Sequence, residues 1–325
     1  MSNLETEPTE TVCAPTVHVR TDVQVITPRD VPLGGPRAMT VRRTLPSRER
    51  TLIGAWCFAD HFGPEDVAVS GGMNVPPHPH TGLQTVSWLF SGEIEHRDST
   101  GAHAMVRPGE LNIMTAGSGI AHSEVSTPTT TVLHGAQLWV ALPNESRHTA
   151  AGFEHYVPGA ARHGDADVRV FLGSLAGDTS PVETFSPLLG AEVVLPPATE
   201  ECFAVDTSFE HGVLIDTGDV LVEGTPVDIG AMGYLAPGAA TIRIRNRGSK
   251  AARVLILGGT PFGEEVIMWW NFMGRSHDDI VAYREQWNAE VDHDREQTQF
   301  GPVEGYDGSP LHAPAIPSTR LKPRS

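Results

Sequence analysis

The sequence contains little cysteine, few basic residues and no long apolar run. Its three cysteines, Cys13, Cys57 and Cys202, are widely separated and odd in number, which argues against a disulfide framework and against a thiolate metal site. No stretch approaches the roughly 18 consecutive apolar residues that a membrane-spanning helix needs. The acidic start, residues 1–5, is unlike a secretory signal. We therefore expect a cytoplasmic protein with reduced thiols and no membrane contact.

The scarcity of basic residues bears on possible partners. Lysine and arginine number 23 against 40 aspartate and glutamate residues, which gives a net charge of -17. A charge of this sign repels phosphate backbones. The densest basic group, Arg243, Arg245 and Arg247, is too small to form a basic patch. The sequence therefore predicts no direct binding of nucleic acid.

Long helical periodicity is also nearly absent, whereas turn-forming residues are frequent. The chain has 33 glycines and 26 prolines against 39% hydrophobic residues, a composition typical of many short strands joined by tight turns. The exception lies near the C-terminus, where Ser276–Asp279 has the pattern of a helix start. Ile280, Tyr283 and Trp287 then recur at helical spacing. We predict an all-β protein in which this short helix covers a barrel.

Two pairs of possible metal ligands stand out, His78 with His80 and His122 with Glu124. The members of each pair are two positions apart, so in a strand their side chains point to the same face. If the two strands lie near each other in a closed barrel, three imidazole nitrogens and one carboxylate oxygen converge. This set suits Fe, Mn, Co, Ni, Cu or Zn. An ion with six ligands would keep two positions for water, dioxygen or substrate, which favours metal-assisted oxidation.

Other interpretations of these histidines remain open. A chain with 15 histidines contains some close pairs by chance, and a histidine beside prolines is often a solvated loop residue. The intervening sequence favours strands, because residues 85–90 are rich in β-branched and aromatic types and a Ser91-Gly92 turn follows. We interpret His96 and His103, which lie beside polar and glycine residues, as surface residues or as residues behind the ligands.

Ordered motifs around the two pairs resemble the pirin family of the cupin superfamily. The matching segments are Leu33–Gly35, Arg43–Pro46, Phe58–Pro64, Pro77–Val86, Arg97–Ser99, Arg107–Glu110, Met114–Glu124, Gln137–Val140, Gly258–Pro261 and Trp270–Met273. The resemblance implies a bicupin, in which two antiparallel jelly-roll barrels lie face to face and the N-terminal barrel holds one metal ion, usually iron. Carried over residue by residue, it implies that the ligands are His78, His80, His122 and Glu124.

The chain departs from the family pattern at Gln84, where many members carry glutamate. A neutral amide cannot act as an anionic ligand or as a general base. Glu124 is therefore the only acidic residue at the positions where the family pattern places a ligand or a base. We therefore assign Glu124 as both metal ligand and catalytic base. The expected cofactor is one divalent ion, Fe(II) first, with Mn, Co, Ni, Cu or Zn as alternatives.

The resemblance and the strand-like segments divide the chain into four parts. The expected parts are a flexible N-terminus (1–14), a barrel with the metal site (15–145), a barrel without a metal site (146–262) and a helix with an extended tail (263–325). The second barrel is expected to lack a site because His155, His163 and His211 have no partner two positions away. The tail is expected to be a solvated strap, with packing across a barrel mouth or a neighbouring subunit as the alternative.

Two functions of different class follow from the resemblance. Similar proteins have quercetin 2,3-dioxygenase activity, which implies a metal-dependent dioxygenase that oxidises a flavonol or a similar enolic small molecule, with Glu124 taking the hydroxyl proton. The alternative is a metal-binding regulatory protein that docks a transcription factor or a metabolic enzyme through a redox-sensitive surface.

Three further expectations accompany these functions. A third interpretation of the same residues is a closed four-ligand zinc site, which would be purely structural. A monomer is expected, because two barrels in one chain already bury the face through which single cupins dimerise. Apolar candidates for a pocket wall, each of which also suits ordinary barrel core, are Val75, Leu83, Trp88, Ile113 and Met114.

Overall fold

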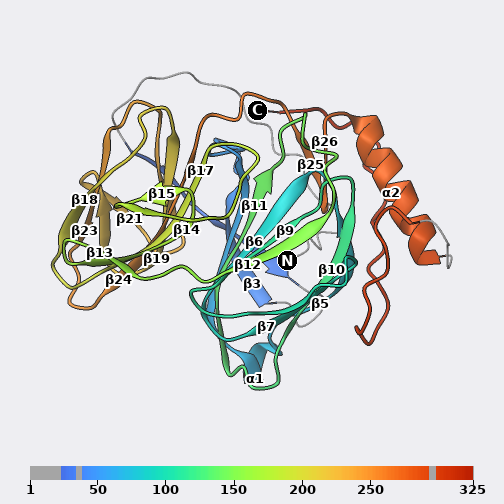
Figure 1. Ribbon diagram of the computed structural model, residues 1–325, viewed down its shortest axis with the longest axis horizontal. Coiled ribbons are helices and arrows are strands. Elements are labelled where there is room, and N and C mark those ends of the chain that lie inside the picture. The colour runs from blue at the N-terminus through green and yellow to red at the C-terminus, as the bar shows by residue number, and fades with distance from the viewer. Residues whose placement is uncertain (1–22, 34–38, 293–297, 325) are drawn as a thin grey trace.

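A computed structural model describes residues 23–33, 39–292 and 298–324. Within these ranges the chain forms two β-barrels side by side, with a 16-residue helix at the outer side of the first barrel (Figure 1). This arrangement confirms the predicted all-β bicupin with a short C-terminal helix. The expected flexible segment 1–14, which includes Cys13, lies outside the described ranges. No helix among the described residues is long and apolar enough to cross a membrane.

Two antiparallel sheets form the first barrel. The larger sheet has seven strands, in the order β12 (Gly152–Tyr156), β9 (Leu111–Thr115), β6 (Leu83–Ser91), β11 (Val132–Ala141), β4 (Trp56–Asp66), β3 (Met39–Leu45) and β2 (Arg29–Leu33). The smaller sheet has four strands, in the order β5 (Asn74–His80), β10 (Ile120–Ser126), β7 (Ile94–Asp98) and β8 (His103–Val106). A one-turn helix, α1 (Val67–Ser70), leads from β4 toward β5. The smaller sheet carries all four predicted ligands.

The second barrel repeats this plan. Its seven-stranded sheet has the order β1 (Gln24–Ile26), β22 (Met232–Leu235), β19 (Glu210–Thr217), β24 (Ala252–Gly259), β17 (Leu188–Leu195), β14 (Ala166–Leu172) and β13 (Ala161–His163). Its smaller sheet has the order β18 (Glu200–Ala204), β23 (Thr241–Asn246), β20 (Val220–Val222) and β21 (Thr225–Val227), and β15 (Ser174–Leu175) forms a hairpin with β16 (Asp178–Thr179). Since β1 pairs with β22, the start of the described chain is tied to the second barrel. The boundaries at residues 145 and 262 stay predictions.

An apolar core is shared by the two barrels. Buried side chains from both halves form one cluster that includes Trp56, Trp88 and Phe171. Trp88 stacks on Phe171 with ring centroids 4.5 Å apart, and the indole N–H of Trp56 donates to the carbonyl oxygen of Leu189. Tryptophan buries a large apolar area while its N–H still finds an acceptor. These contacts fix one barrel against the other.

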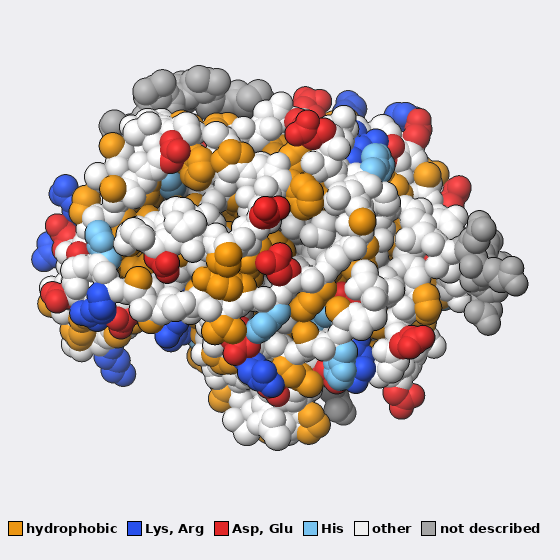
Figure 2. Space-filling model, viewed as in Figure 1, with side chains coloured by type: hydrophobic (Ala, Val, Ile, Leu, Met, Phe, Trp, Pro, Cys, Tyr) orange, Lys and Arg blue, Asp and Glu red, His pale blue; other side chains and the backbone are white. Residues whose placement is uncertain are grey.

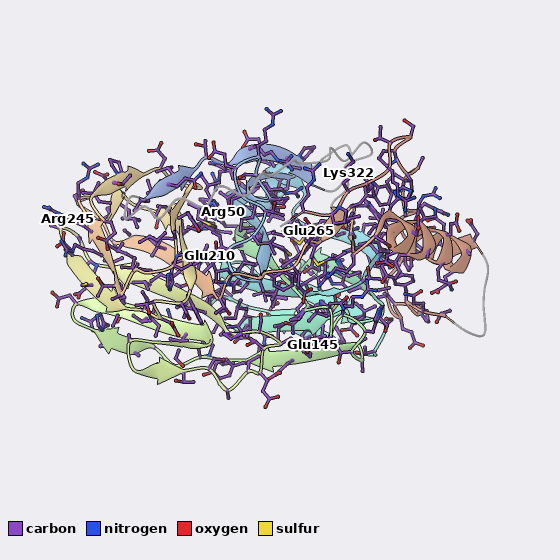
Figure 3. The ribbon with its side chains drawn as sticks, turned by 90° about the horizontal axis from the view of Figure 1, so that it is seen from above. Arg50, Glu145, Glu210, Arg245, Glu265 and Lys322 are labelled. Atoms are coloured by element: carbon purple, nitrogen blue, oxygen red, sulfur yellow. The ribbon has the colours of Figure 1, made fainter. Side chains whose placement is uncertain are left out.

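A polar junction at Glu210 reinforces this contact. Its carboxylate accepts hydrogen bonds from the Arg50 guanidinium at 3.2 Å, the Gly54 amide at 2.8 Å and the Tyr234 hydroxyl at 2.8 Å. The Arg50 guanidinium also lies 3.4 Å from the centre of the Tyr234 ring, in the geometry of a cation–π contact. Figure 3 shows Arg50 and Glu210 close together where the two barrels meet.

Basic side chains on the surface are interspersed with acidic ones. On the face drawn in Figure 2, Lys and Arg side chains lie scattered among Asp and Glu. Arg243, Arg245 and Arg247, the densest basic group of the sequence, are exposed at and beyond β23. Within this group Arg247 forms an ion pair with Asp219 at 2.6 Å, and Arg243 lies 4.0 Å from Glu200. Two of these three arginines therefore lie beside acidic side chains.

The predicted C-terminal helix is confirmed as α2 (His277–Asp292). Its residues Ile280 and Trp287 are buried, and they pack with the aromatic side chains of the hairpin formed by β25 (Ile267–Trp269) and β26 (Phe272–Gly274). The described part of the tail joins the same cluster through Phe300, and the Leu311 amide donates to the Pro77 carbonyl oxygen at 2.9 Å. This part of the tail is therefore anchored on the first barrel, beside the strand that carries His78.

The helix begins with a reciprocal cap that gives a first testable prediction. The Asp279 amide donates to Ser276 Oγ at 3.1 Å, and the Ser276 amide donates to Asp279 Oδ2 at 3.1 Å, which is the capping-box arrangement. We expect Ser276→Ala to lower the free energy of unfolding by about 1 kcal/mol, measured by urea denaturation. Ser276→Thr keeps a capping oxygen and should retain most of this stability. Equal losses in both variants would contradict the capping role.

Candidate metal centre

The three strands β5, β10 and β7 bring polar side chains onto one face of the smaller sheet. His122 lies opposite His78 on β5 and opposite Asp98 on β7, while Glu124 lies opposite His96. Residues that are directly opposite each other in antiparallel strands project to the same face. The sheet therefore gathers these side chains as the two-residue spacing predicts.

Prolines explain why the ligand-bearing strand pairs irregularly. β5 contains Pro76, Pro77 and Pro79, which have no N–H to donate, and it lies at the edge of its sheet, where proline is tolerated. Its register with β10 shifts between His122 and Glu124. Such a bulge bends the strand and changes the direction of nearby side chains. The irregularity lies directly beside the candidate ligands.

His78, His80 and His122 converge on one point. Their potential ligand nitrogens all lie within 4.8 Å of one another, and the Nε2 atoms of His80 and His122 are 3.1 Å apart. All three side chains are fully buried. The edge of the His80 ring also packs against Trp139, with ring centroids 5.1 Å apart. The imidazoles are thus held in fixed positions inside the barrel.

The outer nitrogens of two imidazoles contact main-chain oxygens. His78 Nδ1 lies 2.8 Å from the Pro76 carbonyl oxygen, and His80 Nδ1 lies 3.1 Å from the Asn271 carbonyl oxygen. A carbonyl oxygen only accepts, so in both neutral rings Nδ1 carries the proton and Nε2 keeps a lone pair. This is the tautomer that a ligand binding a metal through Nε2 needs.

The inner nitrogens fit a divalent cation. Nε2 of His80 faces Nε2 of His122, and Nε2 of His78 is buried without a hydrogen-bond partner among the described residues. A buried polar atom left without a partner costs about 1–3 kcal/mol. Burial lowers the pKa of His78 to about 3, and it lowers the pKa of His80 and of His122 well below the ordinary value. The rings are therefore neutral near pH 7, and this donor set supports a divalent metal ion.

Glu124 occupies the same face beside His122. A carboxylate oxygen of Glu124 lies within 4.8 Å of ring nitrogens of His122 and His96 that could also bind a metal. The side chain is fully buried, and Oε1 accepts a hydrogen bond from Ser87 Oγ at 3.2 Å. A buried carboxylate needs such donors or a cation to offset its lost hydration. Glu124 is thus placed where it can face an ion held by His122.

Gln84 and the apolar candidates lie in the barrel wall. Gln84 is buried on β6, and its Nε2 donates to Thr115 Oγ1 at 2.9 Å. The five apolar candidates divide among four separate core clusters, with Trp88 and Ile113 in the core shared by the barrels and Val75, Leu83 and Met114 in three others. This distribution favours the reading of these five residues as ordinary core.

His96 is buried against His122, in agreement with the alternative that it lies behind the ligands. Sequence reasoning missed two other supports, Asp98 and the Asn271 carbonyl. Asp98 contacts His96, and the two residues show the same two-residue spacing as the ligand pairs. That repeated spacing was the available signal. The sequence contains no comparable signal for the Asn271 carbonyl that orients His80, because this group is part of the main chain and lies 191 positions away. His103 is exposed, in agreement with a surface role.

A second buried group lies between the barrels. His61 Nε2 and His134 Nε2 lie 2.7 Å and 2.5 Å from the same oxygen, Oδ1 of Asp216. Arg42 Nε donates to His61 Nδ1 at 3.1 Å, so the proton of neutral His61 is on Nε2 and is donated to Asp216. That nitrogen has no lone pair for a metal. We therefore interpret this group as a polar junction between the barrels.

A buried group of three histidines in one barrel of an antiparallel two-barrel fold defines a bicupin with a candidate metal centre. Two family models match the chain, Pirin over residues 38–140 and the Pirin C-terminal cupin domain over residues 190–291. The chain belongs to the pirin family.

Several relatives are similar over most of their length. A protein of Pseudomonas aeruginosa, named as a proposed quercetin 2,3-dioxygenase, is 42% identical over 297 residues, which are 91% of each chain. A pirin-like protein of Caulobacter vibrioides is 35% identical over 260 residues, covering 77% of this chain and 88% of its own. The crystal structure of a quercetin 2,3-dioxygenase from Acinetobacter baumannii superposes with a TM-score of 0.85 at 36% identity, covering 92% of this chain and 98% of that one.

Proposed function

We propose that the protein is a metal-dependent dioxygenase that acts on a flavonol such as quercetin or on a similar enolic small molecule. The observation that carries the proposal is the convergence of three neutral, fully buried imidazoles: Nε2 of His80 faces Nε2 of His122, and Nε2 of His78 has no hydrogen-bond partner among the described residues. Relatives at 42% and 36% identity that bear the name quercetin 2,3-dioxygenase support the reaction class. Fe(II), a monomeric state and a cytoplasmic location belong to the same proposal.

Each residue of the centre has a role in this proposal. His78, His80 and His122 would hold the ion through Nε2, and Glu124 would be its fourth ligand. A bound divalent ion would supply Lewis-acid and redox chemistry at positions left open by these four side chains. Glu124 would also accept the proton of the substrate hydroxyl, while the Ser87 hydroxyl orients its carboxylate. Trp139, packed against His80, would help to keep water away from the centre.

Oxygen consumption tests this proposal. The protein is stripped of metal, reloaded anaerobically with one equivalent of Fe(II), mixed with quercetin and exposed to air. We expect oxygen uptake that requires both iron and quercetin, and we expect Glu124→Gln to abolish it. Glu95→Gln is the matched control. It is the same carboxylate-to-amide change on neighbouring β7, but Glu95 pairs with exposed His103.

A negative result would be equally informative. If protein shown to hold one iron consumes no oxygen with quercetin or with other enolic substrates, the dioxygenase proposal fails. The regulatory alternative, in which the metal sets the shape of a docking surface, would then be the hypothesis to pursue.

A further inference from the structure

Two residues behind His122 form a hydrogen-bonded chain that leads away from the candidate metal centre. His122 Nδ1 lies 3.4 Å from His96 Nδ1, and His96 Nε2 lies 3.1 Å from Asp98 Oδ2. Both His96 and Asp98 are 3% exposed. Among the three imidazoles of the centre, His122 is thus the one whose outer nitrogen meets another side chain in place of a main-chain oxygen.

The chemistry of the groups gives this chain a direction. A carboxylate only accepts, so Nε2 of neutral His96 carries the proton that Asp98 receives. Nδ1 of His96 then has a lone pair and can only accept the proton on Nδ1 of His122. His122 in turn keeps its lone pair on Nε2, the atom that faces His80. In a chain built on neutral His96, the position of each proton therefore follows from the Asp98 end.

The Asp98 carboxylate is itself held from its other side. Its Oδ1 accepts hydrogen bonds from the Thr100 amide at 2.8 Å, the Thr100 hydroxyl at 2.6 Å and the Ala102 amide at 3.2 Å. Those donors belong to the turn between β7 and β8, so Oδ2 alone is directed at His96. The His96 ring is also stacked on Phe153 of β12, with centroids 4.7 Å apart and planes 27° apart. Neither partner is free to turn away.

We propose that His96 and Asp98 are positioning residues, which hold His122 in the tautomer that binds a divalent metal through Nε2 and so set the affinity of the centre. The proposal rests on the metal site of the proposed function, but it does not depend on which reaction that site carries out. Residues that orient a metal-binding histidine typically change metal affinity or activity by about 10- to 100-fold when replaced.

Asp98→Asn is the sharpest test, because it should reverse the chain without removing an atom. The three donors at Oδ1 hold the amide oxygen of asparagine there, which places the NH2 group at Oδ2. An NH2 group cannot accept from His96, so His96 must carry its proton on Nδ1 and donate it to His122. His122 is then protonated on Nε2. A wrong tautomer produced by the same kind of change strongly reduces catalysis in serine proteases.

The readout is the binding of Co(II) and Zn(II) by the full chain, in competition with a chelator of known affinity. We expect Asp98→Asn to weaken binding by about 10- to 100-fold. His96→Gln should stay close to the native affinity, because its amide can accept from His122 and donate to Asp98 in the native direction. Glu95→Gln makes a carboxylate-to-amide change like that of Asp98→Asn, but Glu95 pairs with exposed His103, so this control should bind metal as the native protein does.

Nitrogen NMR of the histidine side chains adds a measurement that a purely structural role would not change. In the metal-free native protein we expect the His122 proton on Nδ1, and in Asp98→Asn we expect it on Nε2, with the signals assigned through His122→Gln. Native-like metal binding by Asp98→Asn, or a proton on Nε2 in the native protein, would overturn the proposal. If Asp98→Asn fails to fold, the position of the His122 proton in the native spectrum still decides. Failure of the native protein itself to bind either ion would instead refute the metal site.

Discussion

His122→Ala is expected to abolish binding of divalent metal while both barrels stay folded. The substitution removes one of three converging imidazoles and the side chain that links them to His96. The loss of affinity should exceed the roughly 10- to 100-fold expected for a residue behind a ligand. The fold should persist, because the strands of the first barrel are joined by their own ladders and by an apolar core that both barrels share. Metal content after dialysis and the unfolding midpoint in urea measure the two effects separately.

The same variant separates a reactive centre from a structural zinc site. A structural ion contributes folding free energy, so its loss would unfold the first barrel. His103→Ala is the matched control, since His103 is an exposed histidine near the centre in sequence and pairs only at the surface with Glu95. A His122→Ala protein that unfolds while His103→Ala does not would favour the structural reading over the one proposed above.

Asp216→Asn is expected to lower the free energy of unfolding by about 3 kcal/mol or more. The Asp216 side chain is 1% exposed and contacts His61 and His134 of the first barrel, while Arg253 donates to its second oxygen at 3.2 Å. The NH2 group of asparagine would face N–H donors of the histidines or of Arg253, and this buried amide would be left without an acceptor. The urea midpoint of the variant measures the loss. Asp219→Asn is the control, because Asp219 forms an exposed pair with Arg247 that should contribute less than about 1 kcal/mol.

The effect of this substitution should also depend on pH. Burial raises the pKa of Asp216, but contacts with His134 and His61 outweigh that effect and lower the pKa to about 2. The folded-state pKa is thus below the ordinary value of 3.8, so the carboxylate stabilises the fold fully above about pH 4, and this contribution is lost as the pH falls toward about 2. The difference between native and variant stability should shrink over that interval. A difference that stays constant from neutral pH to about pH 2.5 would contradict this assignment.

The candidate site could be predicted in part because strand parity is a local property. A spacing of two places His78 with His80 and His122 with Glu124 on one face whatever the rest of the chain does. The C-terminal helix was predictable for the same reason, since its cap and its buried face lie within one segment. Patterns of this kind need no knowledge of the tertiary structure.

Long-range partners could not be predicted in this way. The pairing of β1 with β22 and the contact of His61 with Asp216, 155 positions away, depend on how the two barrels pack. His96 and Asp98 showed the informative spacing, but their strand neighbours are polar, and only the register of β7 against β10 places them behind His122. The pocket-wall candidates separated into four clusters for the same reason, because apolar character alone does not say which core a side chain enters.

The contact between His80 and Asn271 links the site to the order in which the chain is made. Thr81 and Met273 are also joined by three hydrogen bonds, so the hairpin of β25 and β26 attaches directly beside the ligand-bearing strand. During synthesis the first barrel leaves the ribosome well before this hairpin. The nascent barrel would hold all four candidate ligands but lack the carbonyl that fixes the His80 tautomer. The centre would therefore mature late, and a chain interrupted after the second barrel would carry an unfinished metal site.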